Sequence, residues 1–403
     1  MGISLMFLSR DIRAANTRGE ANDFWYQPLP YRIGGTVSPD SAMRLSVVWS
    51  CVRVLSETVG STPLHMYRRL DRGKERVTDH HLARLIARRP NRWQTAMEWR
   101  EMMQGHLTLR GNAYSEIIYG ARGEITDLVP VNPDSVSVQI NDDGFPIYKV
   151  RDHKGRERVM LWSEILHLRG MSANGYTGMS PIEYERSSIG EALAAQDYGA
   201  RFYQNDAQST RWIEMPGNFK TAEDAKRFRE AWQSAQTGGN RWKTPVLEAG
   251  MKLHEVGIKH TDAQFLETRR YKDSDIARIF RVQPHKVGIL DRATYSNIEM
   301  QAIEFVTDTM LPWFVRWEQT LSMALLDGEE RDELFFEFNV NGLLRGDAKA
   351  RSDFYGSGIQ DGWMTRNEVR ERENLNPLDG LDTPLEPLNM APAGSQETTG
   401  DDE

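Results

Sequence analysis

The sequence has one cysteine, no long hydrophobic run and no excess of basic residues. Cys51 stands alone among 403 residues, so no disulfide can form within the chain, which fits a reducing compartment. Its surroundings, SVVWSCVRVLSETV, form an apolar helical pattern that predicts a buried thiol. No apolar stretch approaches the roughly 18 residues that a membrane-spanning helix needs. The segment ISLMFL near the start is too short for a signal peptide.

Charge is distributed unevenly along the chain. The formal net charge is −8, and the last 23 residues, 381–403, hold six acidic residues and no lysine or arginine. Subtracting these six charges leaves −2, which predicts a nearly neutral folded body and a disordered acidic tail. A tight nonspecific nucleic-acid binder needs a basic face that displaces counterions. The composition therefore argues against strong gripping of phosphates, but a nearly neutral protein can still surround DNA.

Motifs that mark common enzymes are missing too. The sequence has no glycine-rich phosphate loop with lysine, no HExxH, no GxSxG and no cysteine–histidine cluster with zinc spacing. Asp79-His80-His81 fits a helix start capped by Asp79 better than a metal site, because adjacent helical residues point about 100° apart. Asp273 and Asp275 lie on different faces of one expected helix. We expect no catalytic residue, no metal and no cofactor.

The first half of the chain mixes helices with short strands. Ser38 and Pro39 predict a helix start that continues to about Ser61, with Trp49 on its apolar face, and Thr95 with Glu98 forms a capping box. From residue 111 to 169 the apolar period becomes two, and turn signatures separate six short strands. We expect an antiparallel meander and an α+β fold.

Two long helices are expected to flank a small insert. Ser180 and Pro181 begin a helix that runs to about Asn205, and Thr261 begins another that ends near Val282. Residues 209–258 between them predict a strand, a helix and two further strands. The irregular loop 283–295 follows, and then a helix over 296–326 with a kink at Pro312.

The end of the chain predicts a strand and two short helices. The segment LFFEFNVNGLLRGD predicts a strand followed by a turn. Helices are expected over residues 347–355 and 365–373, and the glycines of 356–362 predict a turn between these two helices. The helix 262–282 carries charges of both signs, which suits either a solvated surface helix or a helix packed on copies of itself, and the missing continuous apolar stripe favours the second. Six tryptophans fall in expected helical or loop surface positions, and the sequence favours neither an interface nor an ordinary core role for them: Trp212, Trp232, Trp242, Trp313, Trp317 and Trp363.

The order of these segments resembles the portal proteins of tailed double-stranded DNA bacteriophages, in the compact type that accompanies the HK-type capsid fold. The similar segments cover most of residues 45–380 in the family's order. They are VVWSCVRVLSETVGSTPLHMYRR, LTLRGNAYSEI, ILHLRGMSANGYTGMSPIEYER, YGARFYQNDA, DAQFLETRRYKDSDIARIFRVQPHKVG, ATYSNIEMQAIEFVTDTMLPWFVRWE, FEFNVNGLLRGD and GWMTRNEVRERENLNP.

The resemblance implies a ring, typically a dodecamer, at one capsid vertex with a channel for packaging and ejecting DNA. It implies no enzymatic activity and no membrane, a place in the virion after assembly in the host cytoplasm, and a possible role in nucleating the capsid. Implied partners are the large terminase motor, a head–tail adaptor, the major capsid protein and a scaffold or maturation protease. The implied domains are an arm (1–38), a wing (39–180), stem helices (181–208 and 259–282), a clip (209–258), a tunnel loop (283–295), a kinked wing helix (296–327), a crown (328–380) and the acidic tail (381–403).

The same resemblance assigns candidate residues to three surfaces. In the tunnel loop, Lys286 and Arg292 would touch phosphates weakly while Asp291 limits the attraction. The full sets are His285, Lys286, Asp291, Arg292 and Tyr295 in the tunnel loop; Glu267, Arg270, Lys272, Asp275 and Arg278 on the stem; and Trp232, Arg241, Trp242 and Lys243 on the clip. The aromatic FWYQPLPY stretch predicts that the arm embraces a neighbouring subunit. A capsid-maturation enzyme and a monomeric adaptor are the rival classes.

Overall fold

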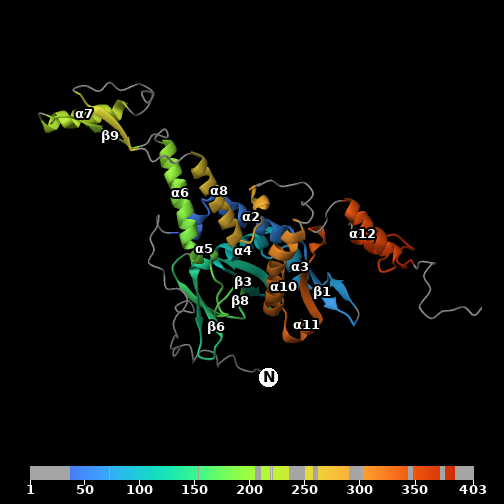
Figure 1. Ribbon diagram of the computed structural model, residues 1–403. Coiled ribbons are helices and arrows are strands. Elements are labelled where there is room, and N and C mark those ends of the chain that lie inside the picture. Colours follow the sequence, from blue (N-terminus) through green and yellow to red (C-terminus); the bar gives the residue numbers. More distant parts are fainter. Residues whose placement is uncertain are drawn as a thin grey trace, which may run out of the picture. The chain divides into compact units, whose positions relative to one another are not determined.

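The structure is a computed structural model, coloured along the chain in Figure 1. It describes residues 37–71, 73–152, 154–204, 210–217, 219, 221–235, 250–256, 262–289, 301, 303–343, 348–372 and 377–385. The chain divides into two compact units, one formed by residues 1–189 with 273–403 and the other by 190–272. Most of the predicted arm (1–36) and most of the predicted acidic tail (386–403) lie outside the described residues.

The first predicted helix is interrupted. Ser38 caps α1 (Pro39–Ala42) by accepting a hydrogen bond from the Ser41 N–H, and α2 (Ser46–Ser61) begins after a short turn. The buried face of α2 includes Cys51, and burial raises the pKa of this thiol to about 12, so the predicted core position is confirmed. Trp49 was expected on the same face, but 53% of it is exposed. The prediction was wrong for this residue, because Val47 and Val48 of the same turn face the core and leave Trp49 at the margin of the buried stripe.

Two further helices pack in this region, α3 (His81–Ala87) and α4 (Ala96–Arg110). The capping box of α4 is confirmed, because Glu98 accepts from the Thr95 N–H at 2.8 Å and donates its own N–H to Thr95 Oγ1 at 3.3 Å. The cap of α3 is His80, whose Nδ1 accepts from the Leu82 N–H at 3.3 Å. The prediction of Asp79 as the cap was therefore wrong by one residue.

A three-stranded antiparallel sheet joins distant parts of the chain. It has the order β11-β1-β2, made from β11 (Leu334–Phe338), β1 (Leu64–Arg69) and β2 (Lys74–Val77). Alternate residues point into the core, so Leu64 and Met66 face inward opposite Phe338 and Phe336. The strand predicted after residue 328 thus belongs to a sheet of the predicted wing.

All six strands predicted between residues 111 and 169 are present, but they form two sheets instead of one meander. The sheets have the orders β4-β3-β8 and β5-β6-β7. The strands are β3 (Asn112–Tyr119), β4 (Ile125–Val131), β5 (Val136–Ile140), β6 (Pro146–Arg151), β7 (Glu157–Leu161) and β8 (Ile165–Arg169). Strand β8 pairs antiparallel with β3 instead of continuing the meander after β7, and four of its five residues are buried.

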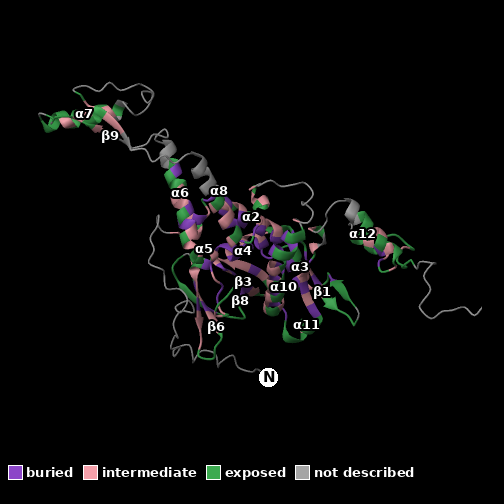
Figure 2. Cartoon of the chain, in the orientation of Figure 1, coloured by how far each residue is buried: buried purple, intermediate pink, exposed green. Residues whose placement is uncertain are grey.

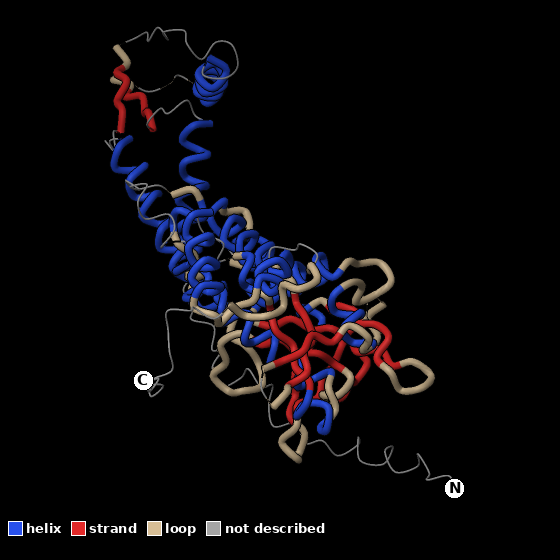
Figure 3. Tube along the Cα trace, turned by 90° about the vertical axis from the view of Figure 1, so that its right-hand side faces the viewer, coloured by secondary structure: helices blue, strands red, loops and turns tan. Residues whose placement is uncertain are grey.

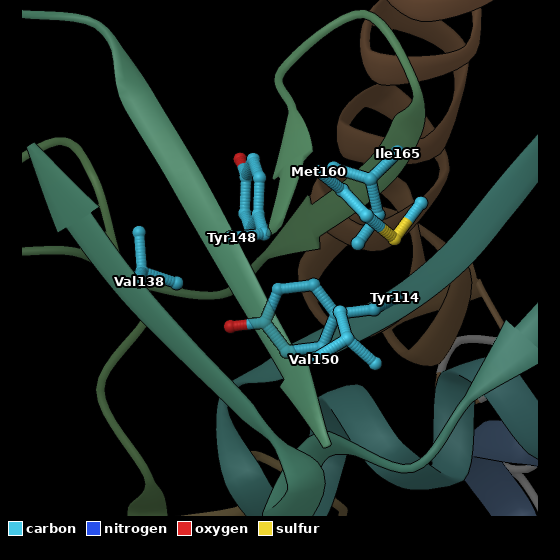
Figure 4. Packing of buried hydrophobic residues seen from close by; sticks show 6 residues of the cluster. All are labelled: Tyr114, Val138, Tyr148, Val150, Met160 and Ile165. Carbon is cyan, nitrogen blue, oxygen red and sulfur yellow. The ribbon is translucent and has the colours of Figure 1, made fainter. Parts of the chain in front are cut away.

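The two sheets share an apolar cluster, shown in Figure 4. Tyr114 of β3 and Ile165 of β8 meet side chains of the other sheet, and the rings of Tyr114 and Tyr148 lie edge to face at 6.0 Å. The remaining members are Val138, Val150 and Met160. Figure 3 shows the strands of the larger unit gathered in one region, and Figure 2 shows the buried residues that they and the adjoining helices contribute.

The predicted long helices are present with changed details. After α5 (Pro181–Tyr184) comes α6 (Arg186–Gln204), and later α8 (Asp262–Ile279) leads into a 3₁₀ turn, η3 (Pro284–Val287). Around Pro312 the helix changes type, because the π-helical segment η5 (Phe305–Met310) precedes α10 (Leu311–Leu325). Pro312 thus stands in the first turn of α10, directly after the π-helical segment.

The last elements of the larger unit are short. They are α11 (Gly328–Glu333), η6 (Val340–Gly342), α12 (Ala348–Gln360) and α13 (Arg366–Arg372). The glycines expected to form a turn at 356–362 lie mostly inside α12, so that prediction was wrong. The predicted tail begins in contact with α13, because Asn367 Nδ2 donates to the Leu378 carbonyl and to Asp382 Oδ1, both at 2.8 Å.

The unit 190–272 contains the predicted insert. Strands β9 (Thr210–Glu214) and β10 (Lys252–Val256) pair antiparallel, and α7 (Ala222–Ala235) lies between them in sequence. The other strand expected before residue 250 lies outside the described residues. Of all the helices described in either unit, none is long and apolar enough to cross a membrane.

Candidate functional site

Three glycines bring three loop segments into direct backbone contact. Gly111 ends α4 with a φ of 71°, and its carbonyl accepts from the Gly170 N–H at 2.7 Å. A Cβ on Gly178 would lie 1.9 Å from the Gly111 oxygen, and a Cβ on Gly111 would lie 2.2 Å from the Met179 oxygen. No side chain fits at either position. We call Gly111, Gly170 and Gly178 the glycine junction.

The glycine junction positions the start of α5, where the first stem helix is predicted to begin. Ser180 Oγ donates to the Leu109 carbonyl at 2.9 Å and accepts from the Glu183 N–H at 3.3 Å, so it joins α4 to the cap of α5. Asn112 holds Gly178 from the other side, accepting from its N–H at 2.7 Å and donating to its carbonyl at 2.8 Å. The helix start at Ser180 is confirmed, and its attachment to α4 and β3 was not anticipated.

A buried histidine continues this network toward the second sheet. His167 Nε2 lies 2.9 Å from Asn112 Oδ1, and its Nδ1 lies 3.1 Å from the Tyr148 hydroxyl. Asn112 Oδ1 is an acceptor, so Nε2 carries the proton and Nδ1 accepts from the hydroxyl. Burial, with a smaller contribution from Arg169, lowers the pKa of His167 well below its ordinary value. His167 is therefore a neutral structural link.

An arginine from α10 reaches the same place. Arg316 Nη1 donates to the Gly170 carbonyl at 2.8 Å and to the Arg169 carbonyl at 3.3 Å. Its guanidinium lies 5.8 Å from the centre of the Trp313 ring. Helix α10 is thus tied to the segment that follows β8 and precedes α5.

Helix α8, the predicted second stem helix, ends in a Schellman motif. The Val282 N–H donates to the Ala277 carbonyl and the Arg281 N–H to the Arg278 carbonyl, both at 3.0 Å. Arg281 takes the left-handed position with a φ of 56°, the one non-glycine residue with positive φ among those described. Its carbonyl accepts a 2.7 Å hydrogen bond from Thr309 Oγ1 of the π-helical segment. The two elements that border the tunnel loop are therefore in direct contact.

The described part of the tunnel loop lies against that π-helical segment. Lys286 Nζ is 5.0 Å from the centre of the Phe305 ring. Partial burial, followed by the charge of Lys286, lowers the pKa of His285. The Ile289 N–H donates to the Pro284 carbonyl at 2.9 Å, which closes the turn. Asp291, Arg292 and Tyr295 lie outside the described residues.

The candidate stem residues have partners within the chain where their side chains are described. Lys272 forms an ion pair with Glu191 of α6, and Arg278 lies 3.1 Å from Asp275 one turn away. The side chains of Glu267 and Arg270 are outside the described set, although both residues belong to α8. Both contacts lie within one chain, so the two interpretations of this helix, a solvated surface helix and a helix packed on copies of itself, remain predictions.

Of the four candidate clip residues, the structure describes Trp232. Trp232 is half-buried on α7, where its ring stacks on Phe228 at 6.5 Å. Phe228 in turn contacts Phe219 at 5.6 Å, so Trp232 ends a row of aromatic side chains. Arg241, Trp242 and Lys243 lie outside the described residues.

The other tryptophans divide between core and surface. Trp317 is completely buried, donates from Nε1 to Gln104 Oε1 at 2.9 Å and meets Trp99 edge to face at 5.5 Å. Trp363 is 53% exposed. Across the described parts of the chain, no group of three or more His, Cys, Asp or Glu residues could hold a metal ion.

Comparisons with known proteins agree with this architecture. The family model described as "Phage portal protein" matches residues 46–374. The portal protein of Enterobacteria phage HK97 is 29% identical over 361 residues, covering 89% of this chain and 85% of the relative. The probable portal protein of Streptomyces phage phiC31 is 34% identical over 397 residues, covering 92% of this chain and 85% of the relative.

Solved structures share the fold. The neck of a native gene transfer agent (GTA) particle, computed with C12 symmetry, matches with a TM-score of 0.59 and 22% identity over 86% of this chain and 95% of that one. An HK97-family phage portal protein from Corynebacterium diphtheriae matches with a TM-score of 0.59 and 17% identity over 78% of this chain and 99% of that one. The family match over most of the sequence confirms the resemblance of the segments, and the chain belongs to the phage portal protein family.

Proposed function

We propose that this portal protein assembles into a ring of twelve copies at one capsid vertex and encloses the channel through which double-stranded DNA is packaged and ejected. The match of the portal family model to residues 46–374 carries this proposal. The C12 symmetry of the GTA neck supports the number of copies. The family is structural rather than catalytic, and the nearly neutral body suits a channel in which DNA slides without being gripped.

The channel wall is assigned to α8 and the tunnel loop. Glu267, Arg270, Lys272, Asp275 and Arg278 form the proposed stem surface, and charges of both signs there would keep DNA from settling at one position. In the loop, the contact of Lys286 with Phe305 suggests that the first turn anchors the loop. Asp291, Arg292 and Tyr295 then form the part proposed to face DNA, with His285 at its base.

The named domains remain part of the proposal. The clip, with Trp232, Arg241, Trp242 and Lys243, is proposed to receive the large terminase and later the head–tail adaptor, while the wing contacts the major capsid protein and a scaffold or protease. Because β11 pairs with β1, we place the boundary between wing and crown after Phe338. The ring would assemble in the host cytoplasm and could nucleate the capsid.

The ring is tested directly by native mass spectrometry and electron microscopy of the purified full chain. We expect twelve subunits around an open channel. A chain that stays monomeric at micromolar concentration and gives no rings would favour the adaptor alternative.

The loop assignment needs a separate test in a DNA-packaging assay. We expect Arg292→Glu to change packaging or DNA retention several-fold, because like charges would repel along the channel. Arg122→Glu, at an exposed position in the turn between β3 and β4, is the control and should leave both unchanged. If Lys286→Glu combined with Arg292→Glu leaves packaging, retention and ejection unchanged, the loop has no role in contacting DNA.

A further inference from the structure

An apolar groove lies beside the glycine junction, within the larger unit. Its volume is about 410 Å³, and Leu55, Leu107 and Phe280 contribute buried apolar surface to it. At its edges Met171 is 69% exposed and Tyr184 is 45% exposed. Exposed methionine and tyrosine around a buried apolar base are typical of a surface that another segment covers.

The groove also carries positive charge. Arg281 and Arg316 line it, with Glu185 as the acidic residue among its lining. Arg316 donates to two backbone carbonyls, and no described carboxylate forms an ion pair with either guanidinium. A ligand that combines aromatic rings with a carboxylate would satisfy both features of the groove.

The described chain begins next to this groove. Pro39 and Arg110 line a neighbouring cavity of about 340 Å³, and Ser180 lines both cavities. Gly111, the residue after Arg110, also lines the groove. The 36 residues that precede Val37 therefore join the described chain close to the groove's edge.

The composition of that preceding segment matches the groove. The stretch EANDFWYQPLPY over residues 20–31 holds three consecutive aromatics, two prolines that favour an extended backbone, and the acidic residues Glu20 and Asp23. The six residues 32–37 that connect it to Ser38 can span about 20 Å when extended. Gly34 and Gly35 in this connection let the backbone turn.

We propose that residues 23–31 of the N-terminal arm bind in the groove of their own chain. The rings of Phe24, Trp25 and Tyr26 cover the apolar surface, and Asp23 lies beside the groove's arginines. The short connection to Ser38 favours the arm's own chain over a neighbouring subunit. The bound arm would then be a further segment of the chain that packs beside the glycine junction.

Crosslinking can test this in the full chain, because Cys51 is buried and its thiol has a raised pKa. Tyr26→Cys is combined with Met171→Cys at the groove, or with Met323→Cys as the control. Met323 is also an exposed methionine, at 54%, and it does not line the groove. Under a mild oxidant we expect the groove pair to form a crosslink within one chain at least fivefold faster than the control pair. Equal rates overturn the proposal, and so does a product that joins two chains.

A labelling experiment gives a second test that does not depend on forming a crosslink. In the Met171→Cys chain we measure the rate of maleimide labelling, then repeat it with Phe24→Ser and Trp25→Ser added. The added changes should raise the rate at least fivefold, while the same changes should leave Met323→Cys unaffected. Slow labelling of Cys51 confirms that each variant is folded. An unchanged rate at Met171→Cys overturns the proposal.

Discussion

The two compact units are stabilised in different ways. In the larger unit, side chains as large as Trp99 and Trp317 are completely buried and backbone segments touch at the glycine junction. Among the side chains described in residues 190–272, Ala192 is the one buried hydrophobic residue. Ion pairs such as Lys272 with Glu191 add little at exposed positions, about 0–1 kcal/mol each, and a two-stranded sheet is marginal alone. The larger unit therefore contains an extensive buried core, whereas the described part of the smaller unit contains little buried apolar surface.

The largest loss of stability in either unit is expected from a substitution at the glycine junction. Gly178→Ala places a methyl group inside the Gly111 carbonyl contact, so it should lower the free energy of unfolding by at least about 4 kcal/mol or prevent folding. Urea denaturation measures this. The control Gly328→Ala meets nothing within 4 Å and should change the free energy by no more than about 0.5 kcal/mol. Similar values for the two variants would mean that the junction is not rigid.

A pair of tryptophan truncations compares the two units directly. Trp317→Ala removes a fully buried ring and its hydrogen bond to Gln104, which should cost about 3–5 kcal/mol in global unfolding. Trp232→Ala removes a half-buried ring from the smaller unit and should cost about 1 kcal/mol. Hydrogen exchange should show that Trp232→Ala lowers the protection of backbone amides only within residues 190–272. The contrast between the units fails if Trp232→Ala destabilises the whole chain as much as Trp317→Ala does.

The buried histidine makes the larger unit sensitive to acid. His167 stays neutral in the folded state because its pKa is lowered, whereas in the unfolded chain it binds a proton below about pH 6.5. Stability is therefore lost as pH falls through the unfolded pKa. Between pH 7.5 and 5.5 the wild type should lose about 1.4 kcal/mol more than His167→Gln. Denaturation at both pH values checks this, and parallel losses would show that His167 becomes protonated in the folded state.

The smallest effect is expected at the end of α8. Arg281→Gly should raise the free energy of unfolding by about 0.5–1 kcal/mol, because glycine takes the left-handed conformation without strain. Arg278→Gly, inside the same helix, should instead lower it by about 1 kcal/mol. Thermal or urea denaturation distinguishes the two. A loss at both positions would mean that the Arg281 side chain contributes more than its backbone strain costs.

Helices and strands whose positions are determined by residues nearby in the sequence were predictable. The capping residues of α4 and α5 and the alternation of β3 to β8 act over a few positions, and those elements appear where expected. The family and its fold were also predictable, because the similar segments keep their order across most of the chain. The candidate residues of the loop, stem and clip remain predictions.

Features that depend on distant residues could not be predicted. Nothing near β8 in the sequence says that it pairs with β3, and nothing near Leu334 points to β1. Gly111, Gly170 and Gly178 were visible as glycines, but only their meeting explains why each lacks a side chain. The π-helical segment before Pro312 was not predicted, and its Thr309 binds the Arg281 carbonyl, a contact made across 28 positions.

The pairing of β1 with β11 has a consequence for synthesis on the ribosome. Leu64 pairs with Phe338, so the inner strand of this sheet emerges long before its partner is translated. Until then Met66 and its neighbours have an unpaired strand edge that other chains could bind. The nascent chain completes this sheet only when β11 has been added. A chain that stops before Leu334 therefore lacks the strand that covers this edge of β1.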